Sequence, residues 1–214
     1  MRIALFVDGN NLYGAQKELG WTVEFSKLIS FASADGQLID ATYFAPTTSK
    51  TNPHIASMIS RAGFSVISKP AIEDKSSGEV YKANMDIELA ANVILSMPIY
   101  DKAVLVTGDG DFEYILSILR THGKLFTIIS TKAIASRQLK NSAGMHFIDM
   151  ADHRDALEYV ATVSETPSDT DQPPKGRIKI LEKVRALPTQ NDLDSKRVKH
   201  ISIRIFRVVS VWIW

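Results

Sequence analysis

Hydrophobic residues of this chain occur in short unbroken runs, separated by segments in which apolar positions follow helical spacing. The first run, Ile3 to Val7, ends at Asp8 and is typical of a strand buried on both faces of a parallel sheet. Runs of the same kind, each bounded by turn residues or polar residues, predict further strands over residues 38–45, 64–68, 103–106, 125–130 and 146–148.

Helices are predicted between these strands. One should follow the first strand after a loop, and the spacing of apolar residues together with glycine and proline stops predicts others over residues 25–34, 52–62, 84–97, 112–121 and 136–142. Residues 69–81 are polar and predict a loop or a small hairpin. The alternation of strands and helices predicts an α/β fold with a doubly wound, mainly parallel sheet.

The character of the chain changes after residue 160. Residues 161–176 contain several prolines and small polar residues and predict a linker, so residues 1–160 would form the domain and residues 177–214 a tail of unknown role. Residues 1–160 carry 15 Lys and Arg against 18 Asp and Glu, a net charge of −3. A broad basic surface for duplex DNA is therefore not expected on the domain.

Cysteine is absent from the chain, which excludes disulfides and thiolate zinc sites. The five histidines show no ligand spacing. The first apolar run is too short for a signal peptide, and no stretch approaches the roughly 18 apolar residues of a membrane span. A soluble, cytoplasmic protein without membrane contact is expected.

Acidic residues stand where a parallel sheet places its functional groups. Asp8 ends the first apolar run, and Asp109 and Asp111 closely follow the strand at 103–106. If the strand order resembles 3-2-1-4-5, these two strands are neighbours where the order reverses, and ligands bind there beyond the carboxyl ends. Asp86 begins the inward-facing stripe of its helix, ahead of Leu89 and further apolar residues. We therefore expect four carboxylates to converge.

Each aspartate alone also has a plain structural explanation. Asp109 or Asp111 could be a turn residue or helix cap, Asp8 could form a turn with Gly9, and Asp86 could stabilise a helix N-terminus. Four carboxylates in one pocket, however, repel one another unless a cation lies between them. Hard oxygen ligands select Mg²⁺ or Mn²⁺, which can activate water for phosphodiester cleavage. The combination favours a metal site.

Three segments of the chain resemble the motifs of NYN domains, which are PIN-like ribonuclease domains. They read Val7-Asp8-Gly9-Asn10-Asn11-Leu12, Lys82-Ala83-Asn84-Met85-Asp86 and Thr107-Gly108-Asp109-Gly110-Asp111-Phe112. The similarity covers about residues 1–150 and is greatest to the LabA-like bacterial branch. It implies a PIN-like, Rossmann-like three-layer sandwich with metal ligands at Asp8, Asp86, Asp109 and Asp111, and with Asn11 and Thr107 in support. Gly110 stands where many members have serine.

These observations predict an endoribonuclease that depends on Mg²⁺ or Mn²⁺, with activated water as the nucleophile and a 5′-phosphate as product. Single-stranded RNA is the expected partner, and a homodimer is left open. Asp8, Asp86, Asp109 and Asp111 are expected to be catalytic; Asn11, Lys82, Thr107, Arg120 and Lys124 are expected to contact substrate. Lys82 could equally be a solvated loop charge.

Two other functions remain as alternatives at this stage. A LabA-like regulatory module would keep the pocket and bind RNA or protein with weak catalysis or none. A metal-dependent phosphatase would normally have a second aspartate two residues after the first, and Asn10 occupies that position here.

Overall fold

The computed structural model of the chain describes residues 1–47, 53–73, 80–82 and 84–160, with the backbone alone described at 53, 54, 72, 73 and 80–82. Its centre is a six-stranded sheet in the order β3-β2-β1-β6-β7-β8, and every neighbouring pair is parallel. The strands are β1 Arg2–Asp8, β2 Gln37–Phe44, β3 Ser65–Ile67, β6 Lys102–Val106, β7 Leu125–Ser130 and β8 Phe147–Asp149. A separate antiparallel pair consists of β4 Ile72–Glu73 and β5 Val80–Lys82.

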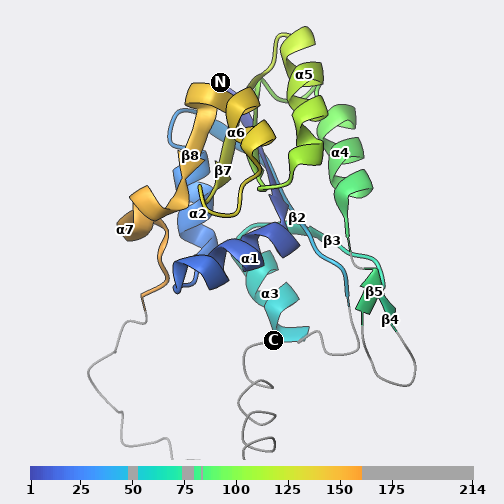
Figure 1. Cartoon of the computed structure of the whole chain (residues 1–214), viewed down its shortest axis with the longest axis vertical. Coiled ribbons are helices and arrows are strands. Elements are labelled where there is room, and N and C mark those ends of the chain that lie inside the picture. Colours follow the sequence, from blue (N-terminus) through green and yellow to red (C-terminus); the bar gives the residue numbers. More distant parts are fainter. Residues whose placement is uncertain (48–52, 74–79, 83, 161–214) are drawn as a thin grey trace, which may run out of the picture. The chain divides into compact units, whose positions relative to one another are not determined.

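Helices cover both faces of the sheet, which gives three layers (Figure 1). One face carries α1 Gly9–Leu19, α2 Phe25–Ala32, α3 Pro53–Arg61 and the short α7 Arg154–Leu157; the other carries α4 Asp86–Leu95, α5 Glu113–Thr121 and α6 Arg137–Ala143. Short 3-10 helices are η1 Gly110–Phe112, η2 Gly144–His146 and η3 Met150–His153.

The unbroken apolar runs reflect burial on both faces. Along β1, Ile3, Leu5 and Val7 pack into the cluster below α1 and α2, whereas Ala4 and Phe6 pack into the cluster below α4 and α5. All five side chains are fully buried. Because successive strand residues point to opposite faces, a strand in the middle layer needs apolar side chains at every position.

The doubly wound α/β fold is confirmed, and the strand order is the one expected. Some boundaries differ from the sequence prediction. No loop separates the first strand from its helix, because α1 starts at Gly9, and the helix expected over 112–121 divides into η1 and α5. Residues 69–81 include the antiparallel pair of β4 and β5, while η3 and α7 were not predicted. The linker and the tail predicted for 161–214 lie outside the described residues.

None of the helices in the described part of the chain is both long enough and apolar enough to cross a membrane.

Candidate metal centre at the carboxyl edge of the sheet

Asp8 and Thr107 lie beside each other at the carboxyl ends of β1 and β6, because the preceding residues, Val7 and Val106, are paired in the sheet. Asp8 is almost completely buried and caps α1: its Oδ1 accepts a hydrogen bond from the Asn11 backbone N–H at 3.1 Å. Its Oδ2 accepts from Asn11 Nδ2 at 2.6 Å and from Thr107 Oγ1 at 3.4 Å. Asp8 therefore serves as a helix cap and is also held at the junction of β1 and β6.

Asn11 and Thr107 connect Asp8 to the loop that follows β6. Asn11 Oδ1 accepts a hydrogen bond from the Gly108 N–H at 3.0 Å, and Thr107 Oγ1 accepts one from the Asp109 N–H at 3.2 Å. These two side chains thus fix the Asp8 carboxylate relative to the loop that carries Asp109.

Asp109 lies directly after this junction and caps η1. It is half-buried, and its Oδ1 accepts a hydrogen bond from the backbone N–H of Asp111 at 3.0 Å, while the Asp111 side chain is exposed. A Cβ on Gly110 would lie 2.9 Å from Ser136 Oγ. Serine at position 110 would therefore crowd Ser136, whose hydroxyl already occupies this part of the edge.

Asp86 approaches from the first turn of α4. It is half-buried, and its Oδ2 accepts a hydrogen bond from Asn84 Nδ2 at 2.7 Å. Leu89 and Val93 are buried on α4, as the helical stripe predicted. Burial raises the pKa of the Asp86 carboxyl, and the negative charges of the other three aspartates raise it further (Asp8, Asp109 and Asp111).

The surroundings at this edge therefore disfavour the charged form of Asp86. Burial also raises the pKa of Asp8, against the hydrogen bonds from Asn11, Asn10 and Thr107 that favour its charged form. Lys69 partly offsets the effect on Asp86, because its positive charge lowers the pKa of that carboxyl. The Lys69 ammonium lies 2.6 Å from Glu88 Oε1.

Sequence reasoning missed Lys69 and Ser136. Lys69 follows the carboxyl end of β3 and Ser136 follows that of β7, so the rule that identified Asp8 and Asp109 could have found them.

Carboxylate oxygens are the donors that Mg²⁺ and Mn²⁺ prefer, so the chemistry of the four aspartates fits such an ion. Their positions fit less closely, since no three His, Asp or Glu side chains within the described residues form a group that could hold a metal ion. The set is close enough for its charges to act on one another but does not converge on one point.

The substrate contacts expected at Arg120 and Lys124 stay a prediction, and the structure places both residues away from the four aspartates. They lie at the far end of α5, and its nine residues span about 13 Å from the loop of Asp111. Arg120 donates to the Ser142 carbonyl and lies over the Phe126 ring, and Lys124 donates to the Tyr100 carbonyl at 2.6 Å. Lys82 ends β5, and its side chain lies outside the described residues.

A sequence profile described as the NYN domain matches residues 2–152. The chain belongs to the NYN domain family. This NYN domain is also 30% identical, over 164 residues, to the protein "Low amplitude and bright protein LabA" of Synechococcus elongatus, an alignment that covers 73% of this chain and 88% of LabA. The resemblance to NYN domains and to the LabA-like branch is thereby confirmed.

A solved structure supports the fold of this NYN domain independently. A protein of unknown function from Vibrio parahaemolyticus superimposes with a TM-score of 0.62 at 21% identity, covering 74% of this chain and 96% of that one. At this identity the likeness concerns the fold alone, and it agrees with a PIN-like three-layer sandwich.

Proposed function

We propose that this NYN domain is an endoribonuclease that hydrolyses RNA phosphodiester bonds with the help of Mg²⁺ or Mn²⁺. The observation that supports it most is the position of Asp8, Asp109 and Asp111 at the carboxyl ends of β1 and β6, with Asp86 on α4 close enough to interact with them. Burial raises the pKa of the Asp86 carboxyl, and the charges of the other three aspartates raise it further. Such mutual repulsion is what a bound cation would relieve.

Each residue has a distinct role in this proposal. The four aspartates would hold the cation, and Asn11 and Thr107 would keep the Asp8 carboxylate aligned with the loop of Asp109 through the hydrogen bonds described above. The bound ion would supply the charge that activates a water molecule and neutralises the leaving oxygen. With water as nucleophile, the expected product carries a 5′-phosphate, and no protein nucleophile is needed.

Unpaired RNA is the proposed substrate. Residues 1–160 have a net charge of −3, so the domain has no excess of positive charge with which to grip a rigid duplex. A single strand is flexible enough to bring one phosphodiester to half-buried carboxylates while contacting a few local cations.

A regulatory module that binds RNA or protein without efficient cleavage is the second candidate. It is favoured by the observation that no three acidic or histidine side chains of the described residues are grouped closely enough to hold a metal ion. The similarity to LabA is compatible with either function.

A cleavage assay separates the two candidates. An unpaired RNA and a duplex of matched sequence are incubated with the full chain in Mn²⁺, Mg²⁺ or EDTA, beside the variants Asp8→Asn and Asp101→Asn. We expect faster cleavage of the unpaired RNA, 5′-phosphate ends, no cleavage in EDTA, and loss of activity only in Asp8→Asn. Binding of RNA without cleavage in any metal would support the regulatory module, and cleavage that persists in EDTA would contradict the metal-dependent mechanism.

A further inference from the structure

The segment between β7 and α6 carries basic side chains at the same edge of the sheet as the aspartates. Lys132 follows β7 directly, Arg137 is the first residue of α6, and Lys140 lies one turn further along that helix. We refer to residues 131–140 as the β7–α6 segment. Because β7 is the parallel neighbour of β6, this segment starts beside the loop that carries Asp109 and Asp111.

The β7–α6 segment packs directly against the loop after β6. The backbone N–H of Ser136 donates a hydrogen bond to the Gly108 carbonyl at 2.9 Å. A Cβ on Gly108 would lie 3.1 Å from the Cα of Ala135, and a Cβ on Gly110 would lie 2.9 Å from Ser136 Oγ. The two segments are therefore closely packed, so a ligand held by the β7–α6 segment near Ser136 would be next to the loop of Asp109 and Asp111.

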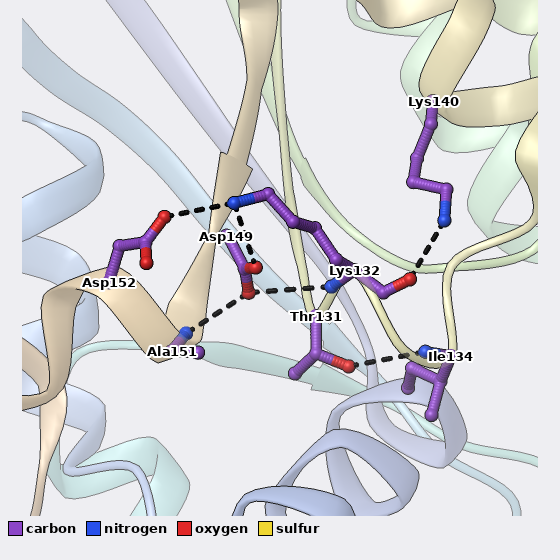
Figure 2. A network of polar contacts seen from close by, with 7 residues as sticks. All are labelled: Thr131, Lys132, Ile134, Lys140, Asp149, Ala151 and Asp152. Carbon is purple, nitrogen blue, oxygen red and sulfur yellow. Dashed lines mark hydrogen bonds and ion pairs between the residues drawn. The ribbon is translucent and has the colours of Figure 1, made fainter.

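Lys132 contacts Asp149 through both its backbone and its side chain, as Figure 2 shows. The buried Asp149 carboxylate accepts a hydrogen bond from the Lys132 backbone N–H at 3.4 Å and one from the Ala151 N–H at 3.1 Å. The Lys132 ammonium lies 3.3 Å from Asp149 and 3.1 Å from Asp152, yet 65% of its side chain is exposed. Lys132 is therefore a largely exposed cation that also contacts Asp149 and Asp152.

Lys140 and Arg137 extend the positive charge along the segment. The ammonium of Lys140 donates to the Lys132 carbonyl at 2.8 Å, whereas the Lys132 side chain runs toward Asp149 and Asp152 (Figure 2), and the Arg137 side chain is exposed. Arg120 and Lys124 lie at the far end of α5 from the loop of Asp111. Arg137, in contrast, directly follows Ser136, whose Oγ lies 2.9 Å from the position of a Cβ on Gly110 in that loop.

We propose that the β7–α6 segment is a phosphate-binding surface that holds the backbone of a single-stranded RNA beside Asp109 and Asp111, through Arg137, Lys140 and Lys132. This inference rests on the proposed function and adds the substrate-binding residues to it. An acidic site repels a polyanion, so the strand needs local cations. The planar guanidinium of Arg137 suits two phosphate oxygens at once, and the lysines add point charges.

The salt dependence of RNA binding tests this inference. The full chain is titrated into a fluorescein-labelled unpaired RNA in EDTA, which prevents metal-dependent cleavage, at several salt concentrations. In the double variant Arg137→Gln, Lys140→Gln the slope of log K against log salt should fall by about 1.4, since each phosphate contact to a single strand contributes about 0.7. At 0.1 M salt this corresponds to a loss of affinity of roughly 25-fold.

The matched control removes two positive charges from a part of the surface away from the β7–α6 segment. The double variant Arg2→Gln, Arg61→Gln loses two exposed guanidinium groups near the amino ends of β1 and β3, and it should keep the wild-type slope. In cleavage assays with Mn²⁺, the Arg137→Gln, Lys140→Gln variant should show a raised KM and a kcat close to that of the wild type, because these side chains bind the strand and do not contact the reacting atoms.

Three results would overturn the inference. An unchanged slope in the Arg137→Gln, Lys140→Gln variant, with wild-type KM, would reject this surface and leave the proposed function intact. An equal fall of the slope in the control would show a general effect of charge. If the wild type neither binds nor cleaves RNA, the proposed function fails, and this inference fails with it.

Discussion

Asp35 and Asp101 at the amino edge of the sheet have different electrostatic surroundings from Asp8 and Asp86 at the carboxyl edge. At the amino edge, the Arg2 guanidinium lies 2.7 Å from Asp101 and holds the pKa of that carboxyl well below its usual range. The Lys102 ammonium lies 2.9 Å from Asp35 and lowers the pKa of the Asp35 carboxyl. At the carboxyl edge, burial raises the pKa of Asp8 and Asp86. Each acid of the amino edge faces a base, whereas Asp86 faces three other acids as well as Lys69.

This difference has opposite consequences for the stability of the folded state. A carboxyl whose pKa is lowered in the folded state stabilises that state at neutral pH, and one whose pKa is raised destabilises it there. The charged forms of Asp8 and Asp86 therefore cost stability in the metal-free protein. Such a cost is common where a site is arranged for a ligand that supplies the missing charge.

Removing two acids from the carboxyl edge should have the largest effect on activity. We expect the RNA cleavage rate of the variant Asp8→Asn, Asp109→Asn to fall by more than about 100-fold. A fall of about 100-fold is the upper end of the loss seen when one residue that orients a metal ligand is removed, and this variant changes two of the ligands themselves. The control, Asp35→Asn with Asp101→Asn at the amino edge, should cleave at close to the wild-type rate. Rates measured with saturating Mn²⁺ compare the two variants; an equal loss in both would refute the contrast between the edges.

Asn11 tests how far the geometry around Asp8 matters without changing any charge. The Asn11 side chain donates a hydrogen bond to the Asp8 carboxylate at 2.6 Å and accepts one from the Gly108 N–H at 3.0 Å. The substitution Asn11→Ala removes both hydrogen bonds, so neither the carboxylate nor the loop after β6 is held by this side chain. We expect a loss of about 10- to 100-fold in metal affinity or kcat, as for other partners that orient a metal ligand.

The control for this change is Glu18→Ala, an exposed position on the same helix, which should behave like the wild type. Full activity of Asn11→Ala would show that Asp8 needs no orientation from Asn11.

Much of this arrangement could be predicted from the sequence, because the relevant signals are local. The apolar run of β1 fixes a strand in the middle layer, and the carboxyl ends of parallel strands fix where Asp8 and Asp109 emerge. The phase of Asp86 with Leu89 and Val93 was sufficient to place it on the buried stripe of α4.

What could not be predicted depends on contacts between distant segments. The partners of Arg120, which are the Ser142 carbonyl and the Phe126 ring, come from the packing of α5 against α6 and β7, and the sequence around Arg120 does not show this packing. The packing of Ser136 against Gly110 likewise joins residues that are far apart in the chain. The sequence indicates a cap as the alternative for Asp109 and a turn with Gly9 as the alternative for Asp8. The structure shows both aspartates as caps, at positions that also belong to the candidate site.

Single substitutions at the two edges should shift thermal stability in opposite directions. In EDTA, the variant Asp86→Asn should have a melting temperature about 2–4 °C above that of the wild type, because the substitution removes a charge that the neighbouring acids repel. This shift corresponds to about 1 kcal/mol in a domain of this size. Asp101→Asn should melt lower, because it weakens the pair with Arg2.

Added Mg²⁺ completes this comparison in thermal melts of the same proteins. The wild type and Asp101→Asn should gain stability from Mg²⁺, and Asp86→Asn should gain less. A lower melting temperature of Asp86→Asn in EDTA, with a wild-type response to Mg²⁺, would make Asp86 a structural residue.

Both edges lie within residues Met1–Val160, which form one compact unit. A protein truncated after residue 160 should therefore fold, melt close to the temperature of the full chain and retain cleavage activity. Circular dichroism melts and cleavage rates of the two proteins, measured side by side, check this expectation. An insoluble or inactive 1–160 fragment would show that residues 161–214 are part of the domain.

Calorimetric titration with Mn²⁺ tests most directly whether the carboxyl edge binds a divalent cation. The wild type should bind Mn²⁺ with measurable heat, and so should the amino-edge variant Asp35→Asn, Asp101→Asn. Binding should disappear in Asp8→Asn, Asp109→Asn, provided that circular dichroism shows the variant to be folded. If that folded variant binds Mn²⁺ as tightly as the wild type, or if the wild type does not bind Mn²⁺ at all, the metal centre proposed at this edge is wrong.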